Sequence, residues 1–363
     1  MSAPTRLPPP RLVRAVERVR DRLYRLHQRL APAPAVMMEM ILAAWMSQAI
    51  TVAAELGVAD ALADGPQPIE DLASRVGANP DALARLLRAM ISRGVFRRRR
   101  DGRYELNALA DTLRRDGFPS MAGMARFVGS PQHREHWSLL ADAVRTGKAV
   151  IPQLRGMPAF DYLAQEPDLA EVFNQAMTSG SEWAVAPLVS AYDFSGYPTI
   201  VDVGGGHGRL LAAVLAAAPH ARGVLYDLPH VVAGAPALLA EHRVTDRVRV
   251  VAGSFFDQVP SGGDAYLLKN VIHDWPDEQA AQILQNVRAA TRPGAVALLV
   301  ELVIPEHDRE FLGKWADLEM LVGAAARERT AAEYRGLLQQ AGFAMTRVVP
   351  TASPFSVVEA RAV

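Results

Sequence analysis

The segment Thr199-Ile-Val-Asp-Val203 runs directly into Gly204-Gly-Gly-His-Gly208, and residues Arg209 to Ala218 then follow a helical pattern. Three of the first five residues, Ile200, Val201 and Val203, are β-branched and apolar, which is typical of a strand covered on both faces of a parallel sheet. Glycines between such a strand and a helix let the backbone approach a ligand closely, with the helix N-terminus facing it. The stretch therefore predicts the opening strand and ligand-binding turn of an α/β domain.

Further apolar runs alternate with helical patterns toward the C-terminus. They span Gly223 to Tyr226, Val248 to Val251, Ala265 to Leu268 and Ala295 to Leu302. Strands that alternate with helices build a mostly parallel, doubly wound sheet. We expect this Rossmann-like domain to occupy residues 181–363.

The N-terminal residues carry a narrow apolar stripe. After the stiff lead-in Leu7 to Pro10, apolar side chains recur at spacings of 4-3-4-3-4, at Leu12, Val16, Val19, Leu23, Leu26 and Leu30. This heptad-like repeat predicts a helical arm over residues 1–35 that ends at the prolines of 32–34. The helix either lies on its own domain or packs on a second subunit, since a narrow stripe is more often a seam between helices.

Residues 36–180 read as a mainly helical domain. The pattern begins with a helix, a turn at Gly77-Ala-Asn-Pro80 and a second helix from Asp81 to Met90. Apolar and polar residues then alternate on both sides of Asp101-Gly102, which predicts a β-hairpin. This is the order of a winged-helix module. The run Arg97 to Arg100 raises the alternative of a DNA-binding regulator. The second helix carries only Arg85 and Arg88, however, which disfavours nucleic acid as a partner.

Composition excludes several classes of protein. The 363 residues have a net charge of +0, so no overall field attracts nucleic acid or membranes, and there are no cysteines for disulfides, thiolate metal sites or cysteine nucleophiles. No His-Glu-x-x-His pattern predicts a metal, and the first ten residues lack a signal-peptide core. Charges interrupt the apolar stretch Met37 to Leu62, which we interpret as a buried helix pair. We expect a cytoplasmic protein.

Two details narrow the ligand of the glycine turn. The dinucleotide fingerprint requires a sixth-position glycine, and that position, counted from Gly204, is Arg209. A nicotinamide cofactor is therefore disfavoured. Asp227 ends the second strand 21 residues after Gly206, a distance at which a carboxylate accepts both hydroxyls of an adenosine ribose. The alternative is an ordinary βα turn with a solvated aspartate.

Five motifs in this order resemble the small-molecule O-methyltransferases, a family that includes plant caffeic-acid and isoflavone enzymes and bacterial antibiotic-tailoring enzymes. They are Asp202 to Gly208, Asp227 to His230, Gly253 to Phe256, Leu268 to Trp275 and Arg327 to Thr330. The resemblance covers nearly the whole chain. It implies S-adenosylmethionine as methyl donor, no metal, a phenolic or polycyclic aromatic acceptor, and a homodimer formed through an N-terminal winged-helix domain.

The resemblance also implies which residues bind the cofactor. Gly204 and Gly206 flank its methionine portion, Asp227 holds the ribose, Ser254 and Phe255 contact adenine, and Lys269 contacts the cofactor further along. The set is Asp202, Gly204, Gly206, Asp227, Leu228, Ser254, Phe255 and Lys269. The plant enzymes have aspartate at the position of Ser254, and a serine accepts a weaker hydrogen bond from the adenine amine.

Methyl transfer to a phenol requires removal of a proton whose pKa is near 10, so a general base helps, and histidine suits that task. His273 follows the fourth predicted strand at the edge where doubly wound sheets bind ligands. It matches the family's catalytic base, although by position alone it could merely cap a helix. The resemblance places Glu301 and Glu328 beside it to orient the ring; otherwise they would be surface charges. Where the family has two glycines, this chain has Gly323-Ala-Ala-Ala326.

Methionines and aromatic side chains are candidates to line a flat, apolar acceptor site, although half of them are expected to be core. The selected residues are Met124, Phe127, Phe173, Met177, Trp275 and Met320, with Trp137, Trp183 and Trp315 as further candidates. Relatives of this architecture that hydroxylate or decarboxylate polyketide-type substrates are the main alternative, and a non-enzymatic cofactor-binding scaffold is another. The histidine with two glutamates favours methyl transfer.

Overall fold

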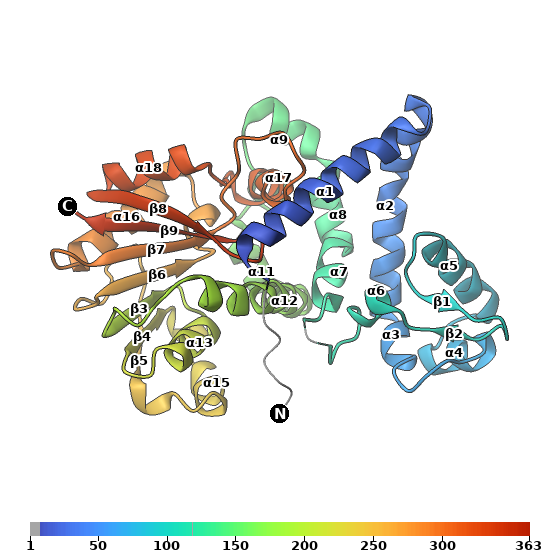
Figure 1. Ribbon diagram of the computed structural model, residues 1–363, viewed down its shortest axis with the longest axis horizontal. Helices are drawn as coiled ribbons and strands as arrows, with labels where there is room; N and C mark the ends of the chain where they lie inside the picture. The colour runs from blue at the N-terminus through green and yellow to red at the C-terminus, as the bar shows by residue number, and fades with distance from the viewer. Residues whose placement is uncertain (1–7, 118) are drawn as a thin grey trace. The chain divides into compact units, whose positions relative to one another are not determined.

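The computed structural model describes residues 8–117 and 119–363, so Leu7 of the predicted lead-in, and most of the first ten residues considered for a signal peptide, lie outside the described residues. The described chain forms two compact units. A sheet unit comprises residues 8–21, 140–156 and 184–363, and a helical unit comprises residues 22–117, 119–139 and 157–183. Figure 1 labels the elements of both units.

The sheet unit contains a seven-stranded sheet of order β5-β4-β3-β6-β7-β9-β8. The strands are β3 (Thr199–Val203), β4 (Arg222–Asp227), β5 (Val248–Ala252), β6 (Ala265–Lys269), β7 (Val296–Glu301), β8 (Phe343–Pro350) and β9 (Ser356–Ala362). The first five are parallel, which confirms the predicted doubly wound sheet, and β9 pairs antiparallel with both β7 and β8. The last two strands were not predicted.

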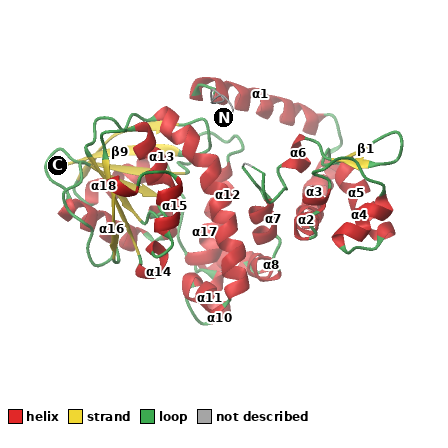
Figure 2. Ribbon diagram, turned by 90° about the horizontal axis from the view of Figure 1, so that it is seen from below, coloured by secondary structure: helices red, strands yellow, loops and turns green. Residues whose placement is uncertain are grey.

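Helices cover both faces of this sheet, as Figure 2 shows. They are α13 (Arg209–Ala217), α14 (Pro229–Val232), α15 (Ala235–Glu241), α16 (Asp277–Ala290), α17 (Leu312–Ala324) and α18 (Ala331–Gln340), with short 3₁₀ turns η1 (Thr245–Arg247) and η2 (Ile272–Asp274). Ile200 packs into one core and Val201 into the other, because successive strand residues point to opposite faces. The edge strand β5 departs from the prediction of full coverage: Val250 is 39% exposed.

The helical unit has the predicted order of helix, turn, helix and hairpin. Its elements are α2 (Ala33–Glu55), α3 (Val58–Ala61), α4 (Ile69–Val76), α5 (Pro80–Ser92), β1 (Arg97–Arg98), β2 (Tyr104–Glu105), α6 (Ala108–Asp111), α7 (Ala122–Val128), α8 (Pro131–Ser138) and α11 (Ala159–Gln165). Gly57 and Gly77 adopt left-handed conformations at helix ends, and Asn79 caps α5 by accepting from the Ala82 N–H. These local signals set the helix boundaries.

Four further helices complete the described elements. The short helices α9 (Leu140–Thr146) and α10 (Val150–Arg155) belong to the sheet unit, while α1 (Pro10–Arg29) and α12 (Pro167–Ala191) contribute residues to both units. The predicted N-terminal arm is therefore helical over Pro10–Arg29, and the chain turns before α2 at residues 30–32.

Long apolar side chains on α1 and α2 are exposed. All six residues of the predicted α1 stripe are at least 50% exposed, and on α2 Trp45 is 71% exposed. Within α2 only Thr51, Ala53 and Ala54 are buried, so the interpretation of Met37 to Leu62 as a buried pair was wrong for the first turns of α2. By length and composition alone α2 could also cross a membrane. Met37, Ile41 and Trp45, spaced four residues apart on α2, thus form an apolar surface that the described residues leave exposed.

Candidate active site

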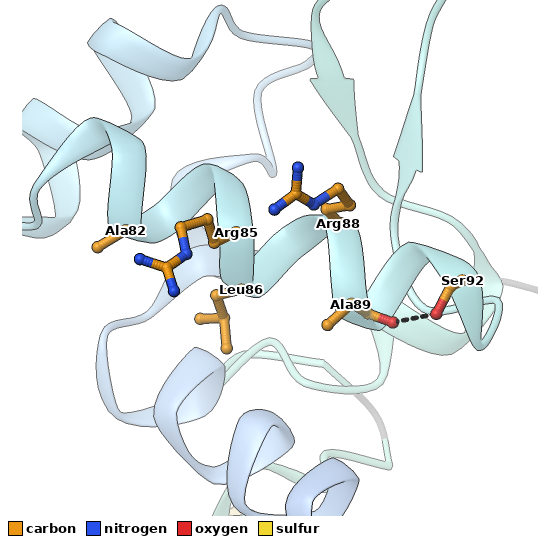
Figure 3. Close-up of a pocket in the computed structure, with 6 residues that line it drawn as sticks. All are labelled: Ala82, Arg85, Leu86, Arg88, Ala89 and Ser92. Atoms are coloured by element: carbon orange, nitrogen blue, oxygen red, sulfur yellow. Dashed lines mark hydrogen bonds between the residues drawn. The ribbon is translucent and has the colours of Figure 1, made fainter.

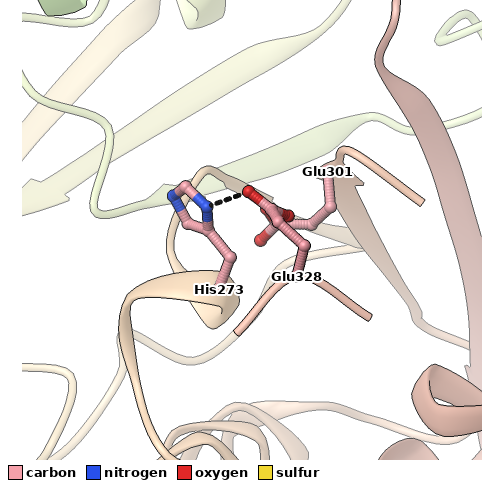
Figure 4. Close-up of side chains that lie close together, drawn as sticks. All are labelled: His273, Glu301 and Glu328. Atoms are coloured by element: carbon pink, nitrogen blue, oxygen red, sulfur yellow. Dashed lines mark hydrogen bonds and ion pairs between the residues drawn. The ribbon is translucent and has the colours of Figure 1, made fainter. Parts of the chain in front are cut away.

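The carboxyl ends of β6 and β7 bring together an imidazole and two carboxylates. Beyond β6, Asn270 has a φ of 53°, a left-handed conformation that asparagine tolerates better than most residues. The chain then enters η2, which presents His273 with a side chain only 13% exposed. Glu301 is the last residue of β7, and Glu328 lies in the segment before α18. Figure 4 shows the three side chains converging.

Glu328 contacts the imidazole directly. Its Oε1 lies 2.8 Å from His273 Nδ1, and its side chain is fully buried. The backbone N–H of Glu328 donates to Asp317 at 2.9 Å, which fixes the segment that carries the carboxylate. A buried acceptor at Nδ1 requires a proton on that nitrogen, and it holds the ring in one orientation.

Glu301 acts on the backbone. Its Oε1 accepts from the N–H groups of Val271 at 3.3 Å and Ile272 at 3.0 Å, and so fixes the strand-to-loop connection just before His273. Ligand-type atoms of the three side chains lie within 4.8 Å of one another. Glu301 is thus close to the ring, as expected, but its recorded hydrogen bonds hold the loop. Its Oε2 and that of Glu328 are buried without a hydrogen-bond partner among the described residues.

The charges around His273 favour its protonated form. Burial by itself lowers the pKa of the imidazole, but neighbouring carboxylates together raise it to about 10. They belong to Asp274, Glu301 and Glu328. Asp274 Oδ1 lies 3.3 Å from Nε2, the nitrogen that faces away from Glu328. Once deprotonated, such an imidazole is a base matched to a phenol, whose own pKa is near 10.

The glycine turn leaves room beside β3. Gly204 and Gly206 have φ values of 68° and 60°, and a Cβ added to Gly206 would meet nothing within 4 Å. Asp227 Oδ2 accepts from the Gly206 N–H at 2.8 Å, and its Oδ1 accepts from the Leu228 N–H at 2.7 Å. The carboxylate is therefore held at the turn with further lone pairs available, which suits the hydroxyls of a ribose.

Two charged residues lie behind this turn. Asp202 is 1% exposed, and burial raises its pKa to about 7, partly offset by Lys269. Burial lowers the pKa of Lys269, while Glu301 and Asp202 oppose that change. A carboxylate and an ammonium group thus share the carboxyl edge of β3 and β6 beneath the turn.

Aromatic rings form a wall after β5. Phe255 and Phe256 are 5.1 Å apart by ring centroids, and Trp275 lies 6.0 Å from the first and 4.7 Å from the second. Asn286 donates to both phenylalanine carbonyls, and Ser254 Oγ accepts from the Phe256 N–H at 3.2 Å. An adenine ring fits such a wall. Trp275 was predicted to contact the methyl acceptor, but in the structure it packs against Phe255 and Phe256, of which Phe255 is predicted to contact adenine.

The remaining predicted acceptor residues are divided between the units. Met124, Phe127, Phe173 and Met177 lie in the helical unit, and Met320 lies on α17 of the sheet unit. Phe127 and Phe173 meet edge to face at 5.4 Å, and Met177 is 38% exposed. Their contact with an acceptor stays a prediction.

A hollow on α5 bears on the DNA-binding alternative. Figure 3 shows its lining residues, which are Ala82, Arg85, Leu86, Arg88, Ala89 and Ser92. Among the residues that line this hollow, Arg85 and Arg88 are the charged ones. This helix face offers two cations where a groove-binding helix would need several phosphate and base contacts.

Sequence reasoning missed three polar residues of the site: Asp274, Asp317 and Arg329. Asp274 and Arg329 lie inside motifs that were recognised, next to the residues selected. Asp317 had no local signal, because its contact with the Glu328 backbone arises only from the fold.

Comparison with known proteins places these features in context. Family models for an O-methyltransferase domain and an O-methyltransferase dimerisation domain match residues 137–344 and 38–116. The phenazine O-methyltransferase of Lysobacter antibioticus is 43% identical over 330 residues, 91% of this chain and 96% of that protein. The solved structure of LaPhzM superimposes with a TM-score of 0.86 and 43% identity, covering 92% of this chain and 100% of that one.

A second solved structure contains ligands. NcsB1, an O-methyltransferase from neocarzinostatin biosynthesis, was crystallised with S-adenosylmethionine and 2-hydroxy-5-methyl naphthoic acid. Its TM-score is 0.74 at 34% identity, and the match covers 88% of this chain and 96% of that chain.

Proposed function

This chain belongs to the O-methyltransferase family, and we propose on that basis that it methylates a hydroxyl of a phenolic or polycyclic aromatic molecule, with His273 as general base. The methyl donor is S-adenosylmethionine, as in the ligand-bound structure to which the fold is similar. Relatives that act on a phenazine and a naphthoate support a flat aromatic acceptor.

The residues of the glycine turn fit the donor. Gly206 leaves open space beside the chain, whereas a Cβ on Gly204 would lie 2.8 Å from Val271 Cγ2, so only glycine fits there. Asp227 offers carboxylate oxygens to a ribose, and we propose that Phe255 contacts the adenine. Asp202, Leu228, Ser254 and Lys269 complete the proposed binding set. When bound, the donor supplies an electrophilic methyl group on a positively charged sulfur.

The protein's own part in the chemistry is to remove a proton. We assign His273 Nε2 as the atom that accepts the acceptor hydroxyl proton, while Nδ1 donates to Glu328. Glu301 holds the loop so that the ring stays in place. A positive charge nearby lowers the pKa of a histidine, so a bound sulfonium favours the neutral, basic form of His273. The buried 2.8 Å contact between His273 and Glu328 is the observation that carries this proposal.

The test is a panel of hydroxylated naphthoates and phenazines incubated with labelled donor and followed by mass spectrometry. We expect a mass gain of one methyl group, and a loss of about 10²–10⁴ in rate for His273→Ala. The control His242→Ala replaces an exposed histidine of the same unit. Full turnover by His273→Ala would overturn the base assignment, while a gain of oxygen or a loss of carbon dioxide would favour the hydroxylase or decarboxylase alternative.

We also propose that the reaction needs no metal. His273, Glu301 and Glu328 have ligand-type atoms close together, but Nδ1 and the two Oε1 atoms are already used in hydrogen bonds. A metal would therefore have to take the two Oε2 atoms and Nε2, the atom to which we assign proton removal. Activity after exhaustive treatment with a chelator should equal that of the untreated enzyme, and its loss with recovery on adding a divalent ion would contradict this.

A second copy of the chain is the partner we propose for the exposed apolar faces. The dimerisation-domain match begins at residue 38, within α2, where Trp45 is exposed. We assign residues 1–35 as an arm packing on that copy, 36–180 as the dimerisation domain and 181–363 as the methyltransferase domain. We further propose that the protein is a cytoplasmic homodimer without nucleic-acid or membrane partners.

Sedimentation equilibrium tests the dimer. Trp45→Arg should weaken dimerisation by about 30-fold or more, because a buried tryptophan at an interface commonly contributes at least about 2 kcal/mol. Val144→Arg is the matched control, since Val144 is 65% exposed and lies outside the dimerisation match. A wild-type protein that sediments as a monomer at micromolar concentration would contradict the proposal.

A further inference from the structure

Arg329 is the largest fully buried side chain in the described part of the chain, at 1% exposure. A guanidinium group loses its hydration when buried, so it is retained only where its donors are satisfied and its charge is paired. The motif Arg327 to Thr330 was recognised in the sequence, but the proposed chemistry uses only its glutamate.

The guanidinium group of Arg329 clamps the loop that carries His273. Its Nη1 donates to the Ile272 carbonyl at 2.9 Å, and its Nη2 donates to the Trp275 carbonyl at 2.9 Å. These two carbonyls lie on either side of His273 in the chain. Nε and Nη2 also donate to Asp277 Oδ1, at 3.1 and 2.8 Å, at the start of α16. One planar group therefore joins both ends of the loop to the helix that follows it.

The same short segment also holds the imidazole ring. Glu328, the preceding residue, contacts His273 Nδ1, and the Arg327 N–H donates to the His273 carbonyl at 3.2 Å. The segment itself is anchored, because the Arg329 carbonyl accepts from the Ile304 N–H at 2.9 Å and Thr330 caps α18. Ring, backbone and carboxylate are thus connected through consecutive residues.

From this geometry we propose that Arg329 is a positioning residue, which keeps the His273 ring in register with Glu328 by clamping residues 272–275. The proposal rests on the role of His273 as base. Arginine suits this position because its planar fork presents donors in several fixed directions at once. Lysine would keep the positive charge but could not span two carbonyls and a carboxylate from one rigid plane.

The test is Arg329→Lys beside Arg335→Lys, a matched control that makes the same exchange at an exposed position on α18. We expect kcat of Arg329→Lys to fall about 10²-fold, as for a displacement of about 1 Å at a catalytic group. The KM for acceptor and the calorimetric Kd for S-adenosylhomocysteine should change less than about threefold. Arg335→Lys should remain within about twofold of wild type in all three.

A second readout separates positioning from a general structural role. If the clamp holds the ring against Glu328, its loss lowers the pKa of His273, and the rising limb of the pH–rate profile moves to lower pH. Asp277→Asn, which keeps both carbonyl contacts, should show a smaller change in the same direction and serves as the second variant if Arg329→Lys fails to fold. An unchanged kcat, equal losses in kcat and cofactor binding, or an unmoved profile would each overturn the inference.

These outcomes are distinct from failure of the proposed function. Inactive His273→Ala with fully active Arg329→Lys would refute the clamp alone. Full activity of both variants would refute the base assignment on which the clamp depends.

Discussion

Replacing Glu328 by glutamine changes one charge and almost no volume, and its effect can be worked out from the structure. The carboxylate is fully buried and lies 2.8 Å from His273 Nδ1. A hydrogen bond to a charged group contributes about 1.5–3 kcal/mol, and 1.36 kcal/mol corresponds to one pH unit. The pKa of His273, raised to about 10 in the native site, should therefore fall by roughly one to two pH units.

The rate should change in a way that depends on pH. Neutral His273 is the active base, so a lower pKa increases the fraction of enzyme in the active form at neutral pH. Against this, the imidazolium that forms during proton transfer is no longer stabilised by the Glu328 carboxylate. The two effects nearly cancel well below the pKa. On the high-pH plateau only the loss remains, and there kcat should be about 10–150-fold lower, which is 1.5–3 kcal/mol expressed as a rate.

The assay combines NMR titration of the histidine ring signals with pH–rate profiles of both proteins. Glu278→Gln is the control, because it makes the same exchange at an exposed position on α16. If the pKa of His273 stayed unchanged or rose in Glu328→Gln, or if kcat on the plateau were unaltered, the assignment of Glu328 as the partner of the imidazole would be refuted.

Three further predictions concern the same domain. In the wild-type enzyme kcat/KM should rise as the pH increases from about 7 toward 10, because His273, whose pKa is raised to about 10, must lose a proton to act as a base. A kcat/KM that stays constant between about pH 6 and 9 would contradict this. Gly205→Ala places a Cβ 2.5 Å from Leu225 Cδ1, so the free energy of unfolding in urea should fall by about 1–3 kcal/mol. In the control Gly336→Ala the new Cβ meets nothing within 4 Å, and the free energy of unfolding should rise by up to about 1 kcal/mol. Equal effects of the two substitutions would refute the packing argument. Asp227→Asn should weaken S-adenosylhomocysteine binding by about 10–150-fold in calorimetry, since a charged acceptor is lost, and an unchanged Kd would remove Asp227 from the binding set.

The antiparallel end of the sheet shows where sequence patterns fail. β9 carries Glu359, which is 5% exposed and held by Tyr192 at 2.8 Å and Arg347 at 2.8 Å. In β9 only Val357 and Val358 are consecutive long apolar residues, a shorter run than those that identified β6 and β7. The burial of that carboxylate depends on these partners, of which Arg347 lies on the neighbouring strand β8 and Tyr192 lies 167 residues away in the chain.

Sequence alone determined what a few neighbouring residues encode: the apolar strands β3 to β7, the glycine turn, the helix ends and the residues that matched the family's motifs. Tertiary structure decided which groups touch. His273 and Glu328 are 55 residues apart, and their 2.8 Å contact, the turning of Glu301 to the backbone and the clamp of Arg329 all arise where separate segments meet at the carboxyl edge of the sheet. The spacing of residues along a chain constrains local conformation, but hydrogen bonds between distant segments depend on packing to within a few tenths of an ångström.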